Sequence, residues 1–300
     1  MLETCNARPS RLTKRRKGGR KKTIVLDSTR SRFSSTALTT ALLAATLGLA
    51  ACASPTAKVD KFAAEHNLAR LILDGKGFKH VAYQKAGTDP DGDLHVYLEG
   101  DGTPWATRTR VASDPTARNP LALRLMLLDP TAALYLGRPC YYSMADVAPC
   151  GPWHWTGGRY SERVVNSMAA ALRRFLQETH YERIRLIGYS GGGVLAMLIA
   201  ERIPGVQTVV TIAANLDIDA WTDLHDYSRL SGSLNPASRQ ALPPNVRQLH
   251  LAGSRDERVP PGLIRKALRS QEVFTFREIP TADHRCCWES VWPSVLRQLE

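Results

Sequence analysis

The chain has 300 residues, of which 43% are hydrophobic, so it is long enough to bury one sizeable core. Its net charge of +12 would suit a nucleic-acid partner, but the charge is concentrated at one end. Residues 1–51 hold eleven of the 40 Lys and Arg residues and two of the 28 Asp and Glu residues, so residues 52–300 carry only +3. A nearly balanced domain without a basic stripe argues against a nucleic-acid partner.

The first 51 residues have the layout of an export signal. A basic stretch over residues 14–32 precedes an apolar run over residues 37–51. A run of about 15 residues is shorter than the roughly 20 that a membrane-spanning helix needs, but it suits the apolar region of a signal peptide. We therefore expect residues 1–51 to be a basic leader and signal peptide that is removed.

The leader ends in Leu49-Ala50-Ala51-Cys52, which resembles the lipobox of bacterial lipoproteins. In that family the Cys thiol is acylated, the chain is cut just before the Cys, and the new N-terminus is acylated as well. The resemblance implies a protein that is anchored to a membrane by acyl chains such as palmitate on Cys52. Ala53 is not the Asp that retains such lipoproteins in the inner membrane, so the resemblance favours the periplasmic face of the outer membrane. An ordinary cleavable signal peptide is the alternative.

The remainder of the chain predicts a tether and one α/β domain. Residues 52–60 are expected to be a lipidated N-terminus and tether, and residues 61–300 the domain. Residues 62–73 are expected to be helical. Strands are expected at residues 78–84, 94–98, 132–136, 184–187, 206–212, 246–251 and 273–279, with helices at 121–127, 161–179, 194–203, 263–268 and 288–299. This alternation predicts a mostly parallel sheet with helices on both faces.

The segment Gly188-Tyr189-Ser190-Gly191-Gly192 has the pattern G-x-S-x-G, directly after an expected strand and before an expected helix. This context is typical of a nucleophile elbow, a tight turn that presents a reactive serine. Glycine at 188 and 192 avoids collisions across the turn. The helix N-terminus that follows favours negative charge at the site. Ser190 is therefore the candidate nucleophile.

A serine nucleophile needs a base, and the base needs an orienting carboxylate. With this motif the chain resembles the α/β-hydrolase family, whose members order the three residues as Ser, acid, His. The resemblance implies His284, after the last expected strand, as the base. It implies Asp256, in a loop that reads G-S-R-D-E-R-V-P, as the acid. The other acids that could take this role are Asp217, Asp219, Asp223 and Asp283, of which Asp217 and Asp219 follow a strand where some relatives carry the acid.

Members of the family stabilise the developing oxyanion with two backbone N–H groups. The resemblance implies Gly191, just after the nucleophile, as one donor and Asp101 as the other, with Gly102 the next possibility. Relatives usually read His-Gly-x at this loop, whereas this chain has Glu99 in place of the His. Carboxylates beside an oxyanion would be costly unless they are turned away or paired. The candidate partners are Arg108, Arg138 and Arg159.

These residues imply a membrane-anchored serine hydrolase that cleaves an ester or related acyl bond through an acyl-enzyme intermediate. A peptidase, a thioesterase or an acyltransferase would use the same residues. The alternative is a non-catalytic binding lipoprotein on the same fold, which the substitution at Glu99 favours. Residues 215–245 leave room for a small cap or none. The sequence contains no pattern for a metal or cofactor, so none is expected.

Four cysteines remain after the leader is removed and Cys52 is lipidated, and they are Cys140, Cys150, Cys286 and Cys287. An even number in an exported protein is typical of disulfide bonds. Adjacent cysteines must strain the backbone to bond, so a Cys286–Cys287 bond is disfavoured. Either other pairing would tie the loop that contains Cys140 and Cys150 to the segment just after His284, and this cross-link is expected.

Overall fold

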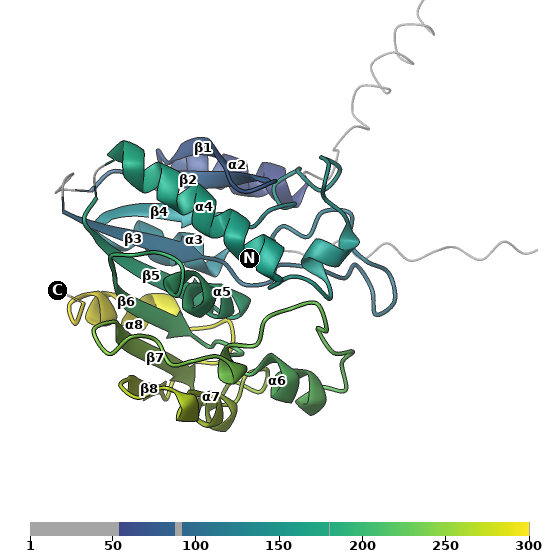
Figure 1. Ribbon diagram of the computed structural model, residues 1–300. Coiled ribbons are helices and arrows are strands. Elements are labelled where there is room, and N and C mark those ends of the chain that lie inside the picture. The colour runs from purple at the N-terminus through teal and green to yellow at the C-terminus, as the bar shows by residue number, and fades with distance from the viewer. Residues whose placement is uncertain (1–53, 88–91, 180, 300) are drawn as a thin grey trace, which may run out of the picture. The chain divides into compact units, whose positions relative to one another are not determined.

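The computed structural model describes residues 54–87, 92–179 and 181–299, and these residues build an eight-stranded sheet with helices on both faces (Figure 1). The strands are β1 (Ala69–Asp74), β2 (Lys79–Lys85), β3 (Asp93–Leu98), β4 (Ala132–Leu136), β5 (Arg183–Tyr189), β6 (Val206–Ile212), β7 (Arg247–Gly253) and β8 (Thr275–Ile279). They lie in the order β1-β2-β4-β3-β5-β6-β7-β8. Strand β2 is antiparallel to both of its neighbours, and all other neighbouring pairs are parallel. The prediction of a mostly parallel sheet is confirmed.

Two layers of helices cover the sheet, as predicted. One layer holds α4 (Glu162–Thr179), α5 (Gly191–Ala200) and α7 (Pro261–Ala267), and the other holds α2 (Pro55–Glu65), α3 (Leu121–Leu127) and α8 (Trp288–Leu296). Figure 1 shows α4 and α5 in front of the sheet, with α3 and α8 behind it. The core has one part on each face of the sheet, because strand side chains alternate between the layers: Leu94, Val96 and Leu98 face the first, and Tyr97 faces the second.

The shorter elements lie in the loops. Helix α6 (Ile218–Leu224) follows β6, and 3-10 turns are formed by η1 (Pro152–Trp155), η2 (Pro236–Ser238) and η3 (Leu268–Ser270). Residues 215–245 thus contain two short helical elements, which agrees with the expectation of a small cap or none. Among the described residues, no helix has both the length and the apolar character that a membrane crossing requires.

The N-terminal part of the domain differs from the sequence-based expectation. Residues 55–60, expected as a tether, belong to α2, whose first turn is capped by the Ser54 hydroxyl oxygen accepting from the Ala57 N–H at 3.1 Å. The helix expected over residues 62–73 ends at Glu65, and β1 begins at Ala69. A short apolar run such as A-R-L-I-L-D is ambiguous between helix and strand, and pairing with β2 decides the outcome. The leader, Cys52 and Ala53 lie outside the described residues.

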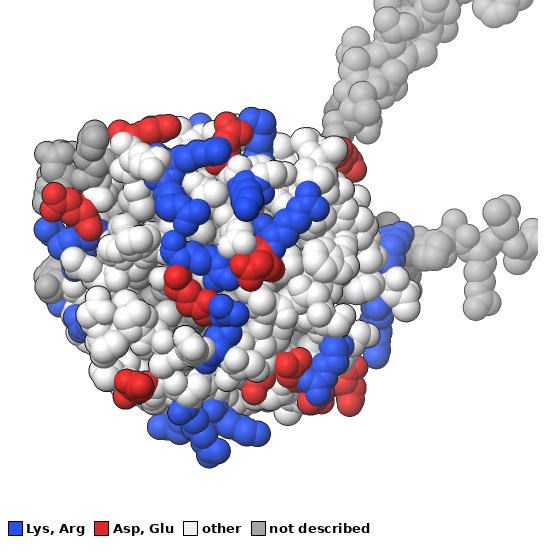
Figure 2. Space-filling model, viewed as in Figure 1, with Lys and Arg blue, Asp and Glu red and all other residues white. Residues whose placement is uncertain are grey.

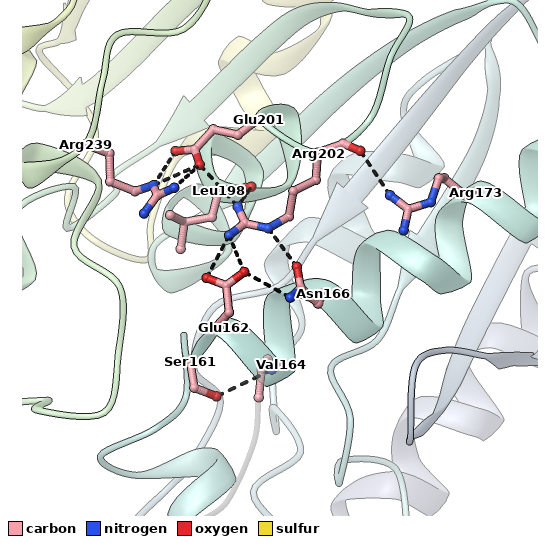
Figure 3. Close-up of polar contacts among 9 residues, drawn as sticks. All are labelled: Ser161, Glu162, Val164, Asn166, Arg173, Leu198, Glu201, Arg202 and Arg239. Atoms are coloured by element: carbon pink, nitrogen blue, oxygen red, sulfur yellow. Dashed lines mark hydrogen bonds and ion pairs between the residues drawn. The ribbon is translucent and has the colours of Figure 1, made fainter.

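A polar network joins α4 to the C-terminal end of α5 (Figure 3). The Arg202 guanidinium donates to both carboxylate oxygens of Glu162, at 2.9 and 3.0 Å, and to the Asn166 side-chain oxygen at 2.9 Å. Beside it, Arg239 donates to both carboxylate oxygens of Glu201. Single exposed ion pairs contribute little to stability, but planar Arg–carboxylate pairs fix geometry. The network therefore links the C-terminal end of α5, the helix that follows Ser190, to α4.

Figure 2 shows Lys and Arg side chains interspersed with Asp and Glu side chains on the face that carries α4 and α5. The ion pairs of Arg202 with Glu162 and of Arg239 with Glu201 belong to this face. A surface of mixed sign at this face gives no continuous basic stripe for a phosphate backbone.

Candidate active site

Ser190 lies in a sharp turn between β5 and α5. Its backbone has φ 52° and ψ −123°, which is an unfavourable conformation for a residue with a side chain. The turn is held by the Ser190 N–H, which donates to the Ile212 carbonyl at 2.8 Å. A Cβ atom at Gly188 would lie 2.2 Å from the Gly192 carbonyl oxygen, and one at Gly192 would lie 2.0 Å from the Leu98 carbonyl oxygen. Both glycines are therefore needed for the chain to turn so closely.

The structure brings Ser190, His284 and Asp256 into one hydrogen-bonded chain. His284 Nε2 is 3.1 Å from Ser190 Oγ, and His284 Nδ1 is 2.9 Å from Asp256 Oδ2. The other carboxylate oxygen of Asp256 accepts from the N–H groups of Arg258 and Val259, each at 2.8 Å. The carboxylate is buried, and one of its oxygens faces His284 Nδ1 as a hydrogen-bond acceptor. It therefore selects the imidazole tautomer with hydrogen on Nδ1, which leaves Nε2 free to accept the serine proton.

The loop after β7, which carries Asp256, contacts the loop after β8, which carries His284. The Arg255 N–H donates to the Ala282 carbonyl at 3.1 Å, so the loop after β7 is tied to the loop after β8. A Cβ atom at Gly253 would lie 2.7 Å from the Ala282 carbonyl oxygen, which explains the glycine there. The Tyr189 hydroxyl donates to the His284 carbonyl at 2.8 Å and links His284 to the strand that leads into Ser190.

The four other candidate acids all have other partners. Asp217 caps α6 by accepting from the Ala220 N–H at 3.1 Å and also accepts from the Asn235 amide. Asp219 accepts from the same amide, Asp223 pairs with Arg229, and Asp283 accepts from two N–H groups of the next turn. Among the described residues, none of the four carboxylates is hydrogen-bonded to the His284 side chain.

The two N–H groups expected to face an oxyanion have no acceptor among the described residues. Gly191 is the first residue of α5, so its N–H has no partner within the helix. The Asp101 N–H is likewise without a bonded acceptor in the described part of the chain. Asp101 follows Gly100, where a Cβ atom would lie 3.3 Å from Ser190 Cβ, so this loop runs directly past the serine.

The Asp101 carboxylate lies close to Gly191, the residue after the serine, in a cluster with two arginines and Tyr160. Arg138 Nη2 is 2.8 Å from Asp101 Oδ1, Arg159 Nη1 is 2.7 Å from Oδ2, and the Tyr160 hydroxyl donates to Oδ1 at 2.6 Å. Burial would raise the pKa of Asp101, but the two guanidinium groups outweigh it and the pKa is lowered. The expected pairing with Arg138 and Arg159 is confirmed, whereas Arg108 is exposed and takes no part.

Comparison with known proteins identifies the fold. No protein-family model matches the sequence, and no curated protein is similar enough in sequence to match. Solved structures do match. Est1E from Butyrivibrio proteoclasticus, with ferulic acid bound, is 14% identical with a TM-score of 0.56 over 76% of this chain and 97% of that one. A putative hydrolase from Agrobacterium vitis is 14% identical (TM-score 0.53, 77% and 97% covered), and an esterase from Pyrococcus furiosus is 12% identical (0.51, 79% and 92%).

The chain has the α/β-hydrolase fold. At identities of 10 to 16% this likeness shows the fold and leaves the reaction open. The loops that the α/β-hydrolase fold gathers at the carboxyl ends of its parallel strands are those that carry Asp101, Ser190, Asp256 and His284.

Glu99, the residue that departs from the usual pattern of the α/β-hydrolase oxyanion loop, is buried and bonds to main-chain groups. One of its carboxylate oxygens accepts from the Gly100 N–H and the other from the Ala122 N–H, each at 3.0 Å. Glu99 therefore binds the first turn of α3, where a negative charge suits the helix N-terminus. Burial raises its pKa to about 7, despite the two N–H groups that favour the ionised form.

The raised pKa of Glu99 predicts a pH-dependent stability. Between about pH 5 and pH 8 the folded protein binds the Glu99 proton more tightly than the unfolded chain does. The contribution of this carboxyl to the free energy of unfolding therefore falls as the pH rises, by on the order of 2 kcal/mol over this range. Glutamine at position 99 does not titrate. The free energy of unfolding of Glu99→Gln should therefore increase relative to that of the wild type as the pH rises over this range. Urea unfolding at four pH values measures the difference, and a difference that does not vary with pH would contradict the assignment.

The disulfide bonds correct the sequence-based expectation. The structure pairs Cys140 with Cys150 and Cys286 with Cys287, so the expected cross-link between the two segments is wrong. Successive turns between Cys140 and Cys150 fold the chain back on itself and leave their Cα atoms 5.4 Å apart, a normal separation for a disulfide. The adjacent pair is accommodated at the start of α8, where Cys287 takes the left-handed conformation with φ 77°. The disulfides therefore stabilise each loop separately.

The contacts of two tyrosines at the site were not predicted from the sequence. Tyr160 contacts Asp101, and Tyr189 contacts His284. Tyr160 is 59 residues from Asp101 and Tyr189 is 95 residues from His284, so no local pattern links either pair. Their positions follow from the convergence of strand ends at one edge of the sheet.

Proposed function

We propose that this protein is a serine hydrolase that cleaves an ester or related acyl bond, with a carboxylic ester the first choice, and that it is anchored to a membrane by lipid on Cys52. The observation that carries the hydrolase proposal is the chain of hydrogen bonds from Ser190 through His284 to Asp256, at 3.1 and 2.9 Å. Its serine is in the strained turn that this chemistry requires.

In the proposed reaction Ser190 Oγ attacks the carbonyl carbon of the substrate while His284 Nε2 takes the hydroxyl proton. Asp256 orients the imidazole and stabilises the imidazolium that forms. The protonated His284 then gives the proton to the leaving alcohol, and an acyl group remains on Ser190. Water, deprotonated by the same imidazole, attacks the acyl carbon and releases the carboxylic acid.

The N–H groups of Gly191 and Asp101 are the proposed donors to the oxyanion. The connection between β4 and α4 helps to hold the second donor, because its Arg138 and Arg159 both pair with the Asp101 side chain. Two guanidinium groups against one carboxylate leave an excess positive charge behind the oxyanion loop. A fixed positive charge of this kind favours an anion that develops only in the transition state.

The contacts of Glu99 weaken the argument for the alternative, a non-catalytic binding protein. That argument rested on the carboxylate of Glu99, which would have opposed an oxyanion beside Ser190. The carboxylate instead binds the N-terminus of α3. The ferulic acid bound to Est1E adds esters of aromatic acids to the substrates worth testing, alongside simple alkyl esters.

The test is a panel of p-nitrophenyl esters of increasing acyl length, with a feruloyl ester, a thioester and a peptide compared under the same conditions. The chain from Ala53 onward is used, because residues 52–300 form a unit of their own. We expect measurable turnover of the oxygen esters and labelling by a fluorophosphonate probe. Absence of both turnover and labelling would reject the hydrolase proposal.

The proposed anchor predicts a separate result. Full-length protein expressed in a bacterium should partition with membranes and incorporate labelled palmitate, and Cys52→Ser should abolish the incorporation. The change Cys5→Ser in the leader is the matched control and should leave both properties intact. Palmitate incorporated by the Cys52→Ser variant would show that the anchor is elsewhere.

A further inference from the structure

The loop between β3 and α3 contains a hairpin that begins immediately after Asp101. At its base the Thr103 N–H donates to the Pro115 carbonyl at 2.8 Å. Farther out, Trp105 and Val111 form an antiparallel bridge. Residues 105–110, the tip of the hairpin, are exposed. The hairpin is therefore an ordered projection from the edge of the sheet that carries the proposed active site.

The first turn of α2 is attached to the base of this hairpin. The Thr56 hydroxyl donates to Asp114 Oδ2 at 3.0 Å and lies 3.4 Å from the Thr116 hydroxyl. Cys52 is four residues before Thr56 in the sequence, and four residues of extended chain span at most about 14 Å. An acyl anchor on Cys52 would therefore keep the hairpin, and with it the oxyanion loop, close to the membrane.

A groove of about 150 Å³ lies beside the attachment point, between α2 and the residues that lead into α3. Val59, Phe62 and Pro120 supply apolar lining. Lys58 and Arg118, which also line the groove, are exposed. An apolar groove with cationic side chains at its margin matches the chemistry of a phospholipid, which joins acyl chains to a negatively charged headgroup.

The exposed cations of this region have no acidic partners. Arg108 and Arg110 at the hairpin tip, and Lys58 and Arg118 at the groove, form no ion pair with a described residue. Trp105, beside the two tip arginines, is 44% exposed although it is a large aromatic residue. Tryptophan is favoured at membrane interfaces, and each cation near an anionic lipid surface adds to binding.

We propose that the hairpin of residues 103–115, with Lys58 and Arg118, is a docking face for an anionic phospholipid surface, and that it turns the active-site edge toward that surface. The proposal rests on the proposed hydrolase function and deepens it, because it makes esters held in a membrane the substrate class. The apolar groove favours lipid over nucleic acid, because acyl chains can fill it and a phosphate backbone cannot.

Co-sedimentation with vesicles tests the docking face on the chain from Ala53 onward, which carries no lipid. Vesicles that contain phosphatidylglycerol should bind it, and vesicles of phosphatidylcholine alone should bind it much more weakly. The triple change Arg108→Glu, Arg110→Glu and Arg118→Glu should weaken binding at least about tenfold. The matched control, with Lys266→Glu, Arg269→Glu and Arg297→Glu, alters the charge equally at other exposed positions and should bind as the wild type does.

A second variant, Trp105→Ala, keeps every charge and should also weaken binding. For the triple variant, hydrolysis of a water-soluble ester and fluorophosphonate labelling should stay unchanged, while hydrolysis of an ester carried in phosphatidylglycerol vesicles falls. Failure of the wild type to bind these vesicles, or an equal loss in the matched control, overturns the docking face. Vesicle binding without any hydrolysis or labelling overturns the hydrolase proposal and leaves the docking face standing.

Discussion

Replacement of Ser190 by Ala is expected to lower kcat/KM for p-nitrophenyl esters by about 10⁶-fold, because it removes the nucleophile of the proposed reaction. The oxyanion donors at Gly191 and Asp101 would remain, so a small residual rate above that of water is expected as well. The fold should be unaffected, since the Ser190 side chain is bonded in the described structure to His284 and to no main-chain group. Steady-state kinetics and thermal unfolding measure the two expectations.

The control for this change is Ser228→Ala, which alters an exposed serine in the loop after α6. It should keep wild-type kinetics. A fluorophosphonate probe forms a covalent bond with an activated serine, so it should label the wild type and the Ser228→Ala variant and leave Ser190→Ala unlabelled. Labelling that survives in Ser190→Ala would place the nucleophile elsewhere.

Replacement of Asp256 by Asn is expected to reduce kcat by about 10⁴-fold at neutral pH. The reason lies in the contacts of the carboxylate. Its Oδ1 accepts two N–H groups, from Arg258 and Val259, so the Asn oxygen should keep that position. The Asn amide nitrogen would then face His284 Nδ1 and donate to it. The imidazole would be held in the opposite tautomer, with hydrogen on Nε2, and could not take the proton of Ser190.

The matched control is Asp217→Asn, because Asp217 and Asp219 are the main rivals for the role of the acid. Asp217 caps α6 and accepts from Asn235. Its change should cost about 1 kcal/mol or less of stability and alter kcat by a few-fold at most. A loss of kcat near 10⁴-fold in Asp217→Asn, with Asp256→Asn little affected, would reverse the assignment.

Much of the fold could be predicted from the sequence because its signals are local. The strand-like and helical runs from residue 78 onward correspond to β2 through β8 and to their helices. The prediction of a helix over residues 62–73 was wrong for its second half. The run from Ala69 to Asp74 has too few residues to show whether its apolar side chains recur with a helical or a strand period. Pairing with β2, a contact between segments, made it a strand.

The disulfides were mispredicted for a similar reason. The rule against adjacent cysteines is a statement about average backbone strain, and the conformation that Cys287 takes at the start of α8 is not visible in the order of residues. The return of the chain from Cys140 to Cys150 depends on three successive turns in a loop without a repeating pattern. Pairing of cysteines is decided by the path of the chain, which the sequence does not give.

The sequence by itself determined the elbow around Ser190, since a strand, a G-x-S-x-G turn and a helix are all local features. It also singled out Asp256 and His284, because they follow strands in the order of the α/β-hydrolase pattern. Tertiary structure decided where the carboxylates of Glu99 and Asp101 point, and it brought the N-terminal turn of α2 against the hairpin beside the oxyanion loop. These contacts join residues far apart in sequence. The Asp101 cluster exists because parallel strands bring their carboxyl ends to one edge of the sheet, and α2 is placed by the packing of Val59 and Ala63 in the core.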